Sequence, residues 1–423
     1  MSKIYTVAVI GCGSRGWVYG NEMYNKPDKY KIVSICDIDT TRLKNAQAKW
    51  GIEDSNLFTD EKEFFKEKRA DVLILATQDR DHVRMCVRAM ELGYDIVLEK
   101  PISPLYDELI ELLEANKKYK RAVVVCHVLR YAPAFVKIKE IIEKGEIGKL
   151  IRIESIEQVD YWHQAHSFVR GNWRNDKETS PMIMQKCCHD LDLLQWYVGS
   201  KCKTVYSTGD LAFFNRDNQP EGAADRCQDC KFINTCPYSA ERLYIERWKA
   251  QNCPEWGWPF NVVCSTLPNT EEGIRKAYQE SQYGRCVFAC DNNVVDNQSV
   301  DMVFENGIKV TLTMTAFTDK MGRRMCFHGS LGEIELNEPE GLLTVWKFGG
   351  EKKVYKTSEL VENEKDEFNH GGGDAKLCDS LYAVINDGVV AGTSLESSVE
   401  SHLMALAAEK SRKEGIIVNV HEE

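Results

Sequence analysis

The chain has 423 residues, of which 43% are hydrophobic and 28% charged, and its formal net charge is −11. This composition is typical of a globular protein, and the acidic balance argues against a broad electrostatic grip on nucleic acid. No stretch approaches the ~18 uninterrupted apolar residues that span a bilayer, and the start of the chain lacks the pattern of a secretory signal, so a cytoplasmic protein without membrane partners is expected.

The first part of the chain alternates short apolar runs with amphipathic stretches. The expected strands are Tyr5–Ile10, Tyr30–Cys36, Asp71–Ala76, Asp95–Leu98 and Ala122–Cys126, and the expected helices are Val18–Tyr24, Thr41–Trp50, Asp81–Leu92 and Tyr106–Tyr119. Strands that alternate with helices indicate a parallel sheet with crossover helices. We therefore expect an α/β Rossmann domain over residues 1–126.

The pattern changes after residue 126. Lys149–Val159, Val300–Phe304, Gly307–Ala316 and Leu342–Lys347 alternate apolar and polar residues, as antiparallel strands with one solvated face do. These segments predict an α+β domain over residues 127–423. Polar, cysteine-containing sequence interrupts it at about residues 215–290, and a long helix is expected over Leu395–Arg412.

A glycine-rich loop follows the first strand. Gly11, Gly13, Ser14, Arg15 and Gly16 form a G-x-G-x-x-G pattern between strand and helix, where backbone N–H groups and the helix N-terminus bind a pyrophosphate. Asp37 ends the second strand and is placed to accept hydrogen bonds from a ribose, which favours NAD. Arg15 and Arg42 could reach an extra phosphate, so NADP stays possible.

A second group of reactive residues lies on an expected helix that starts at Ser180-Pro181 and ends at Gly199. Gln185 and His189 are four residues apart and would share one face, and Lys186 is three residues before His189. A histidine with a pKa near 6.5 is a suitable base for an alcohol proton. We therefore take His189, Gln185 and Lys186 as candidate catalytic residues.

A stretch dense in rings and hydrogen-bond donors precedes this helix. Aromatic rings pack on the C–H faces of sugars, while polar groups bind the hydroxyls. The candidate substrate-binding residues are Tyr161, His166, Arg170, Trp173 and Arg174, together with Arg130.

The polar interruption contains Cys227, Cys230 and Cys236, with Cys286 further along, among the 16 cysteines of the chain. Three thiolates at this spacing and a fourth from elsewhere match a structural zinc site that would hold a loop without a core. An iron–sulfur cluster uses similar ligands, so it stays open as the alternative. Unliganded cysteines are the third possibility.

Three motifs carry a family resemblance: Glu99-Lys100-Pro101, the segment Thr77–His82, and His189-Asp190-Leu191-Asp192. With the glycine loop, they resemble the Gfo/Idh/MocA oxidoreductases, the family of glucose-fructose oxidoreductase and inositol dehydrogenase. The resemblance implies a second domain with a large, open, mostly antiparallel sheet that serves as an oligomer interface, in a homodimer or homotetramer.

The same resemblance suggests roles for the residues of these motifs. It places Lys100 beside the nicotinamide and the reacting hydroxyl, and Thr77, His82 and Glu99 in the cofactor groove. A lysine ammonium there would stabilise negative charge on the substrate oxygen. The family carries an aspartate four residues before the histidine, where this chain has Gln185, and a neutral amide cannot raise the basicity of the ring by charge.

The leading hypothesis is an NAD-dependent dehydrogenase that acts on a CH–OH group of a sugar, a sugar derivative or a cyclitol. One alternative is a glycosidase that oxidises a sugar carbon transiently, eliminates the aglycone and then reverses the oxidation. The other is a non-catalytic sensor of dinucleotide or sugar.

Overall fold

A computed structural model describes residues 3–361 and 370–421. Its strands are β1 (Tyr5–Ile10), β2 (Tyr30–Cys36), β3 (Leu57–Phe58), β4 (Val72–Leu75), β5 (Asp95–Leu98), β6 (Val123–Val125), β7 (Leu150–Gln158), β8 (Cys202–Asp210), β9 (Asn297–Phe304), β10 (Lys309–Thr315), β11 (Gly322–Gly329), β12 (Gly332–Asn337), β13 (Leu342–Lys347), β14 (Lys352–Lys356) and β15 (Val418–Asn419). Its helices are α1 (Ser14–Tyr24), α2 (Thr40–Trp50), α3 (Glu61–Phe64), α4 (His82–Glu91), α5 (Tyr106–Tyr119), α6 (Pro133–Glu143), α7 (Tyr161–His163), α8 (Met182–Gln185), α9 (Cys188–Val198), α10 (Arg247–Ala250), α11 (Phe260–Val263), α12 (Glu271–Glu280), α13 (Gly373–Asp387) and α14 (Leu395–Glu414).

The first sheet is parallel and has the strand order β3-β2-β1-β4-β5-β6. Its central strands are apolar throughout because helices cover both faces, and Val72–Leu75 are all buried. The strand order reverses between β1 and β4, where ligands bind at the carboxyl ends of the strands. Gly11, Thr77 and Glu99 each lie just beyond such an end, so the fold gathers three predicted cofactor residues at one edge.

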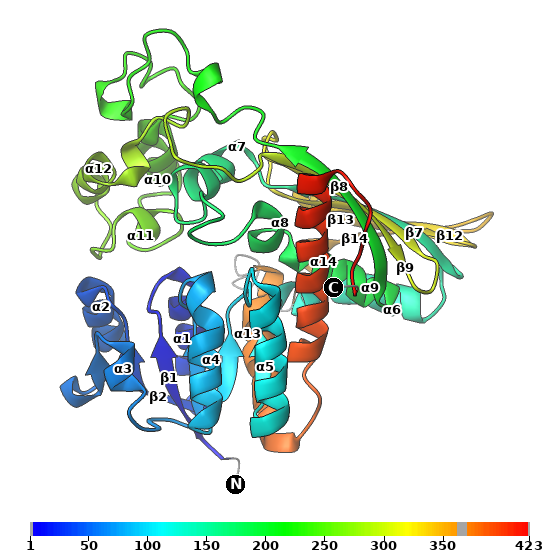
Figure 1. Cartoon of the computed structure of the whole chain (residues 1–423), viewed down its shortest axis with the longest axis horizontal. Helices are drawn as coiled ribbons and strands as arrows, with labels where there is room; N and C mark the ends of the chain where they lie inside the picture. The colour runs from blue at the N-terminus through cyan, green and yellow to red at the C-terminus, as the bar shows by residue number, and fades with distance from the viewer. Residues whose placement is uncertain (1–2, 362–369, 422–423) are drawn as a thin grey trace.

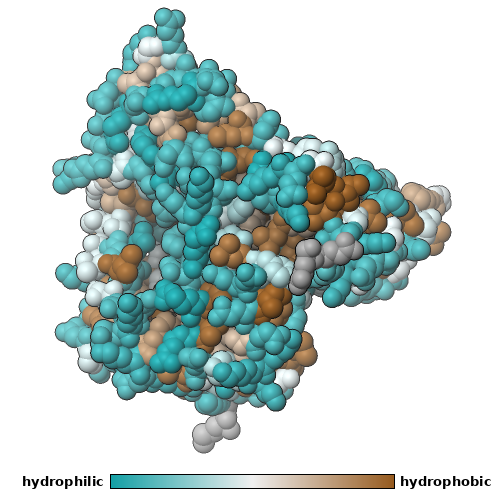
Figure 2. Space-filling model, in the orientation of Figure 1, coloured by the Kyte–Doolittle hydropathy of each residue, from teal (hydrophilic) through white to brown (hydrophobic). Residues whose placement is uncertain are grey.

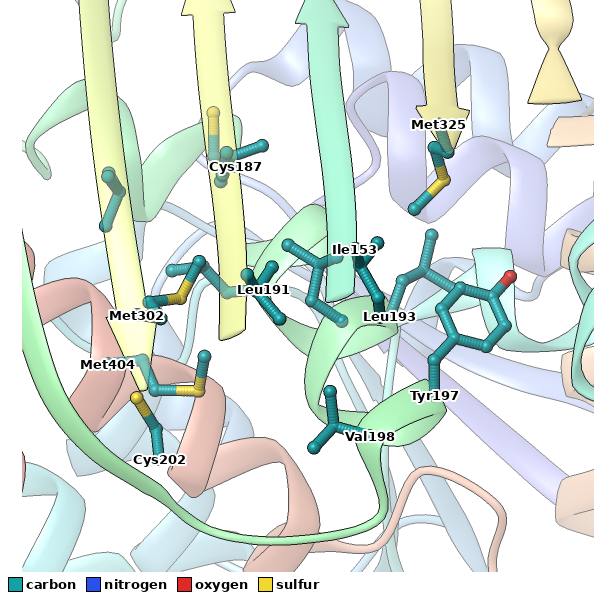
Figure 3. Close-up of a cluster of buried hydrophobic side chains, with 14 of the residues drawn as sticks. Ile153, Cys187, Leu191, Leu193, Tyr197, Val198, Cys202, Met302, Met325 and Met404 are labelled. Carbon is teal, nitrogen blue, oxygen red and sulfur yellow. The ribbon is translucent and has the colours of Figure 1, made fainter. Parts of the chain in front are cut away.

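The second sheet has the order β14-β13-β12-β11-β7-β10-β9-β8-β15. Only β10 and β7 pair in parallel among its described strands, so the predicted large, mostly antiparallel sheet is confirmed. Figure 3 shows how one face of this sheet is filled: Leu191, Leu193 and Tyr197 of α9 lie below Ile153 and Met325 of the strands.

The last two helices return to the Rossmann domain. Leu377 and Leu381 of α13 pack in the same core as β1 and α1. The long helix α14 runs beside both sheets (Figure 1), and its His402 Nε2 accepts a hydrogen bond from the backbone N–H of Ile102 at 2.8 Å. The division at residue 126 therefore stays a prediction, because the C-terminal segment contributes to the first core.

The interruption at residues 215–290 contains α10, α11 and α12, which lie above the Rossmann domain in Figure 1. Its hydrophobic core includes Tyr244, Phe260 and Tyr278, each fully buried, and is shared with Trp162 and Phe214 from outside the interruption. The expectation of a loop without a core was wrong, because aromatic residues scattered through a polar sequence collect at one place.

None of the helices in the described ranges is long and apolar enough to cross a membrane. Figure 2 shows hydrophilic side chains over most of the visible face, with hydrophobic ones gathered where the nine-stranded sheet lies.

Candidate active site at the carboxyl edge of the Rossmann sheet

The glycine loop is shaped by close backbone approaches. A Cβ at Gly11, whose φ is +87°, would lie 2.3 Å from the carbonyl oxygen of Ala76, and a Cβ at Gly16 would lie 1.8 Å from that of Gly11. A Cβ at Gly13 would meet only Arg42, at 3.6 Å. Gly11 and Gly16 are thus required by the fold itself, whereas Gly13 leaves room before the N-terminus of α1, where a pyrophosphate fits.

Asp37 holds the glycine loop from the end of β2. Its carboxylate accepts hydrogen bonds from the backbone N–H of Cys12 at 2.6 Å and of Asp39 at 2.8 Å. Burial raises the pKa of Asp37, which the two backbone bonds partly oppose. Arg42 also lies beside the loop, with its Nε 3.5 Å from Asp39 Oδ2. An acidic and a basic group therefore both border the glycine loop.

Lys100 stands at a turn held from several sides. The Lys100–Pro101 peptide bond is cis, and the backbone N–H of Lys100 donates to Glu99 Oε2 at 2.8 Å. The other oxygen of Glu99 accepts from Arg15 Nε and the Tyr19 hydroxyl, both at 2.9 Å.

Arg15 also pairs with the buried Asp374 of α13. Two carboxylates thus hold the guanidinium of Arg15, and its contact with the cofactor stays a prediction. Both carboxylate oxygens of Glu99 accept hydrogen bonds from groups of the chain, and its place in the cofactor groove stays a prediction.

The ammonium of Lys100 reaches the segment that carries His189. Lys100 Nζ donates to the backbone oxygen of Gln185 at 3.2 Å. His189 is almost fully buried, and its Nδ1 has no hydrogen-bond partner among the described residues. Burial, and then the charge of Lys100, hold the pKa of His189 well below its ordinary value. The ring is therefore a neutral imidazole beside a cation, which is the state that accepts a proton.

The single helix expected over residues 180–199 is broken. Helix α8 ends at Gln185 and α9 begins at Cys188, so Gln185 and His189 are not stacked one turn apart. With its amide oriented to suit its neighbours, Gln185 donates to Asp79 Oδ2 at 3.1 Å and accepts from Trp173 Nε1. Gln185 thus positions Asp79 and Trp173 and does not orient the imidazole.

Asp79 is the site residue that sequence reasoning missed. It is 3% exposed, and its carboxylate also accepts from the Ser180 hydroxyl at 2.6 Å. Burial raises the pKa of Asp79, while the charges of His82 and Lys100 lower it. The family has a carboxylate at the position of Gln185. In this chain Asp79, which lies beyond the end of β4, supplies a carboxylate that accepts a hydrogen bond from the Gln185 side chain. The sequence did offer one signal for Asp79: it lies two residues after Thr77, within the segment Thr77–His82 that carries the family resemblance.

Two further predicted cofactor residues lie at the same edge. His82 is buried between the backbone oxygens of Pro101, 2.8 Å from Nδ1, and of Thr77, 3.2 Å from Nε2. It therefore links the end of β4 to the cis turn after β5. The half-buried Thr77 hydroxyl lies 3.9 Å from the sulfur of Met85.

Two family models match the chain. The model described as oxidoreductase family, NAD-binding Rossmann fold, covers residues 5–127, and that of the C-terminal alpha/beta domain of the same family covers residues 139–420. The chain belongs to the Gfo/Idh/MocA oxidoreductase family. The resemblance found in the sequence is confirmed, and the chain is an NAD-binding oxidoreductase.

Relatives within the Gfo/Idh/MocA family agree with this assignment. A Bacillus subtilis chain described as an oxidoreductase, YteT, is 23% identical over 372 residues, which are 84% of this chain and 82% of YteT. Inositol 2-dehydrogenase of Salmonella typhimurium is 25% identical over 198 residues, 47% of this chain and 55% of that one. The expectation of an NAD-dependent dehydrogenase is confirmed at the level of the enzyme class.

Solved structures share the fold. An oxidoreductase from Agrobacterium radiobacter, in complex with NAD+, L-tartaric acid and magnesium, superimposes with a TM-score of 0.70 at 15% identity, over 98% of both chains. Scyllo-inositol dehydrogenase from Lactobacillus casei, with NAD(H) and scyllo-inositol, gives 0.68 at 14% identity, over 99% of this chain and 100% of that one.

Several charged candidates of this Gfo/Idh/MocA chain are held in ion pairs. Lys186 Nζ lies 3.0 Å from a carboxylate oxygen of the fully buried Glu157, on β7. Arg130 grips Asp192 with two bonds of 2.6 and 2.7 Å. Lys186 was expected to do proton chemistry and Arg130 to bind substrate; a buried carboxylate pairs with each cation, and both roles stay predictions.

Several residues of the aromatic segment before α8 contact other parts of the chain and not the candidate site. His166 is buried with Nδ1 3.1 Å from the Tyr244 hydroxyl, inside the core of the insertion. Arg174 pairs with Asp291 at 2.8 Å, and Tyr161 packs against the insertion core. These contacts lie within the chain, and the expected contact of Tyr161, His166 and Arg174 with substrate stays a prediction.

Of the six substrate candidates, only Trp173 reaches the site, through Gln185. The sixth candidate, Arg170, lies beside the four cysteines.

The insertion reaches over the glycine loop. Trp256 stacks on Trp17 of α1 at 6.2 Å between ring centroids. A cavity of about 320 Å³, counted with its part open to solvent, lies between Gly13, Ser14 and Arg42 on one side and Trp256 and Ser265 on the other. The predicted cofactor edge is therefore covered by a segment that the Rossmann sequence pattern does not contain.

The described residues do not form the zinc site that was expected from the sequence. Across residues 3–361 and 370–421, no group of three or more His, Cys, Asp or Glu side chains is arranged to hold a metal ion. The tetrahedral site expected from Cys227, Cys230, Cys236 and Cys286 is thus not formed, although all four line one cavity.

Proposed function

We propose that this oxidoreductase transfers hydride between NAD and a hydroxyl-bearing carbon of a sugar, a sugar derivative or a cyclitol. The observation that carries the proposal is the meeting of Lys100 with the segment of His189, at the carboxyl edge of the Rossmann sheet. Inositol dehydrogenases among the relatives support a polyhydroxylated substrate.

Each of the site side chains would have its own role in this reaction. His189 takes the hydroxyl proton, which its neutral ring and unpartnered nitrogen allow. Lys100 stabilises the charge that develops on the oxygen. Asp79, Gln185 and Trp173 keep the wall of the site in place.

The glycine loop with Gly13 and Ser14 and the carboxylate of Asp37 would hold the dinucleotide. When bound, its nicotinamide accepts the hydride. Asp37 favours NAD over NADP, since a carboxylate repels a 2′-phosphate.

The test uses purified protein, NAD+ and a panel of inositols, aldoses and sugar acids, with the absorbance of NADH as the readout. We expect one class of polyol to reduce NAD+. Lys100→Met and His189→Ala should each lower kcat by roughly 10²–10⁴ while NAD binding persists. Undiminished turnover by Lys100→Met would refute the proposal.

The same preparation separates the alternatives. Cleavage of aryl glycosides that requires NAD+ but releases no NADH would point to the glycosidase. Tight binding of NAD without either reaction, across the whole panel, would point to the sensor.

The proposal extends to a cytoplasmic homo-oligomer, a dimer or tetramer. Strand alternation turns Ile156, Tyr206 and Val303 away from the core under the large sheet, and they are 40%, 41% and 38% exposed. A sheet face with such apolar positions suits a second copy of the chain. Light scattering on the eluting protein should give a mass at a multiple of the monomer, and a monomer at micromolar concentration would refute this part.

A further inference from the structure

The His189 ring takes up its proton in a place that is almost closed to water. Oxidation of a CH–OH group releases a hydride and a proton, and in the proposed reaction the hydride goes to NAD+ and the proton to His189. His189 is 8% exposed. The ring has to lose this proton before the next turnover, so the chain needs a route from His189 to solvent.

Two imidazole rings next to His189 can receive the proton. The charged or titratable groups that act on His189 are Lys100, His127, His370 and Arg323. The ammonium and the guanidinium have no acceptor atom, so neither can take up a proton. The ring centroids of His127 and His370 lie 5.7 and 6.2 Å from that of His189. The route therefore begins at one of these two histidines.

His127 leads into the interior of the protein. It is fully buried, and its ring lies 5.8 Å from that of His402, which is also fully buried. His402 already has a partner on each nitrogen: Nε2 accepts from the N–H of Ile102, and Nδ1 lies 2.7 Å from the backbone oxygen of Ser398. Burial, and then the charge of Arg130, hold the pKa of His127 well below its ordinary value. This branch ends inside the protein.

His370 leads to the surface. Its side chain is 40% exposed, and its Nδ1 lies 2.9 Å from Oδ2 of the buried Asp374. Burial raises the pKa of Asp374, but the charges of Arg15 and His370 outweigh this effect and hold that pKa well below its ordinary range. An ionised carboxylate can only accept, so Nδ1 of His370 carries the hydrogen, and Nε2 is the nitrogen that takes up a further proton.

The backbone around His370 is held in an unusual conformation. The φ of His370 is +48°, in the left-handed region that residues other than glycine rarely adopt. Such a conformation persists where the surrounding structure enforces it. Here the ring is bound to Asp374, and α13 begins so close to the turn after β6 that a Cβ at Gly373 would lie 2.3 Å from the carbonyl oxygen of Val128. The fold thus keeps this imidazole beside His189 and in contact with solvent.

We propose that His370 carries the proton of the oxidised hydroxyl from His189 to water. The inference rests on the proposed dehydrogenase function. In each turnover the C–H and O–H bonds of the substrate break, the hydride reduces NAD+, and the proton binds His189. The proton then moves to Nε2 of His370, directly or through one water molecule. His370 releases it to solvent while its Nδ1–H stays bonded to Asp374.

The charges around the two rings favour this outward direction. Burial, and then the charge of Lys100, hold the pKa of His189 well below its ordinary value, so the protonated ring gives up its proton readily. The ring that receives the positive charge has the ionised Asp374 beside it. In the intact chain the transfer is faster than turnover, and it limits the rate only when His370 is removed.

The experiment follows the hydride and the proton separately. Stopped-flow absorbance records NADH and a pH indicator in weakly buffered solution, with the inositol, aldose or sugar acid that reduces NAD+. In the wild-type chain both signals should rise together. His370→Asn suits the left-handed backbone but cannot carry a proton. Its first turnover should form NADH at the wild-type rate, while proton release and later turnovers slow by roughly 10²-fold. Added imidazole should restore both.

His421→Asn is the matched control. His421 is exposed, and its Nε2 lies 3.1 Å from a carboxylate oxygen of Glu400, so it is also a surface histidine beside a carboxylate. Its substitution should leave the two signals together. NAD binding at the wild-type affinity, measured by calorimetric titration, shows that each variant is folded.

The results separate this inference from the proposed function. Proton release that keeps pace with NADH in His370→Asn, or a delay that imidazole does not remove, would overturn the role of His370. In both cases NADH still forms, and the dehydrogenase activity stands. Absence of NADH from the wild-type chain across the whole panel would overturn the proposed function, and the role of His370 with it.

Discussion

The ion pair of Arg130 and Asp192 allows a direct test of whether Arg130 stabilises the fold or binds the substrate. Sequence reasoning gave Arg130 to the substrate, whereas the structure closes it on Asp192 with two short hydrogen bonds, both side chains being buried. Asp192→Asn keeps the shape and removes the charge. Breaking a buried pair by removing one partner costs about 3–5 kcal/mol, because the other charge is left uncompensated.

This loss can be converted to a melting temperature. The entropy of unfolding is about 2.1 cal/mol/K per residue, or about 0.9 kcal/mol/K for 423 residues that unfold as one unit. A loss of 3–5 kcal/mol then lowers Tm by about 3–6 °C. Scanning calorimetry at a fixed scan rate measures this shift, and the KM for the substrate at 20 °C should stay within twofold of the wild type.

Asp225→Asn is the matched control, since Asp225 and Arg216 form an equally short pair at 2.6 Å on the surface. We expect no measurable change in its Tm, because exposed pairs contribute little. An unchanged Tm in Asp192→Asn together with a large rise in KM would show that Arg130 serves the substrate after all, and the argument from burial would fail.

Three further outcomes are expected. Gly16→Ala should abolish NAD binding in calorimetric titration, because its Cβ would lie 1.8 Å from a backbone oxygen; retained binding would contradict the loop geometry. Burial and Lys100 keep the pKa of His189 low, so the imidazole stays neutral below pH 6.5, and NAD+ reduction should show no histidine titration between pH 6 and 8. Lys100→Met removes only the second cause, so the pKa of His189 should rise while burial keeps it below its ordinary value; a residual rate that falls on acidification at no higher pH than in the wild type would count against the pairing. Trp256→Ala uncovers the glycine loop and should raise the dissociation rate of NADH, measured by stopped-flow fluorescence; an unchanged rate would mean that the insertion does not cover the cofactor.

The sequence predicted five of the six Rossmann strands and missed the two-residue strand β3. Strands β1, β2 and β5 begin and end where predicted, because a strand that helices cover on both faces is mostly apolar. The second sheet was only partly foreseen. Strands β11 and β12 carry charged residues on both inward and outward positions, such as the buried Arg323 and the exposed Glu335, so their alternation is hard to separate from that of loops.

The site was predictable where backbone motifs fix it and less so where side chains decide. Gly11, Asp37, Lys100 and His189 follow from fixed places at strand ends and on one helix. The roles of Arg15 and Lys186 depend on whether a carboxylate from a distant element forms an ion pair with them. No local pattern reports that Asp374 and Glu157 do so.

The hydrogen bond from the N–H of Ile102 to His402 connects the turn of Lys100 to α14, 300 residues further along the chain. His402 is fully buried and is not one of the candidate site residues. A substitution such as His402→Ala would therefore act on the position of Lys100 through the backbone of Ile102, with every candidate site residue unchanged.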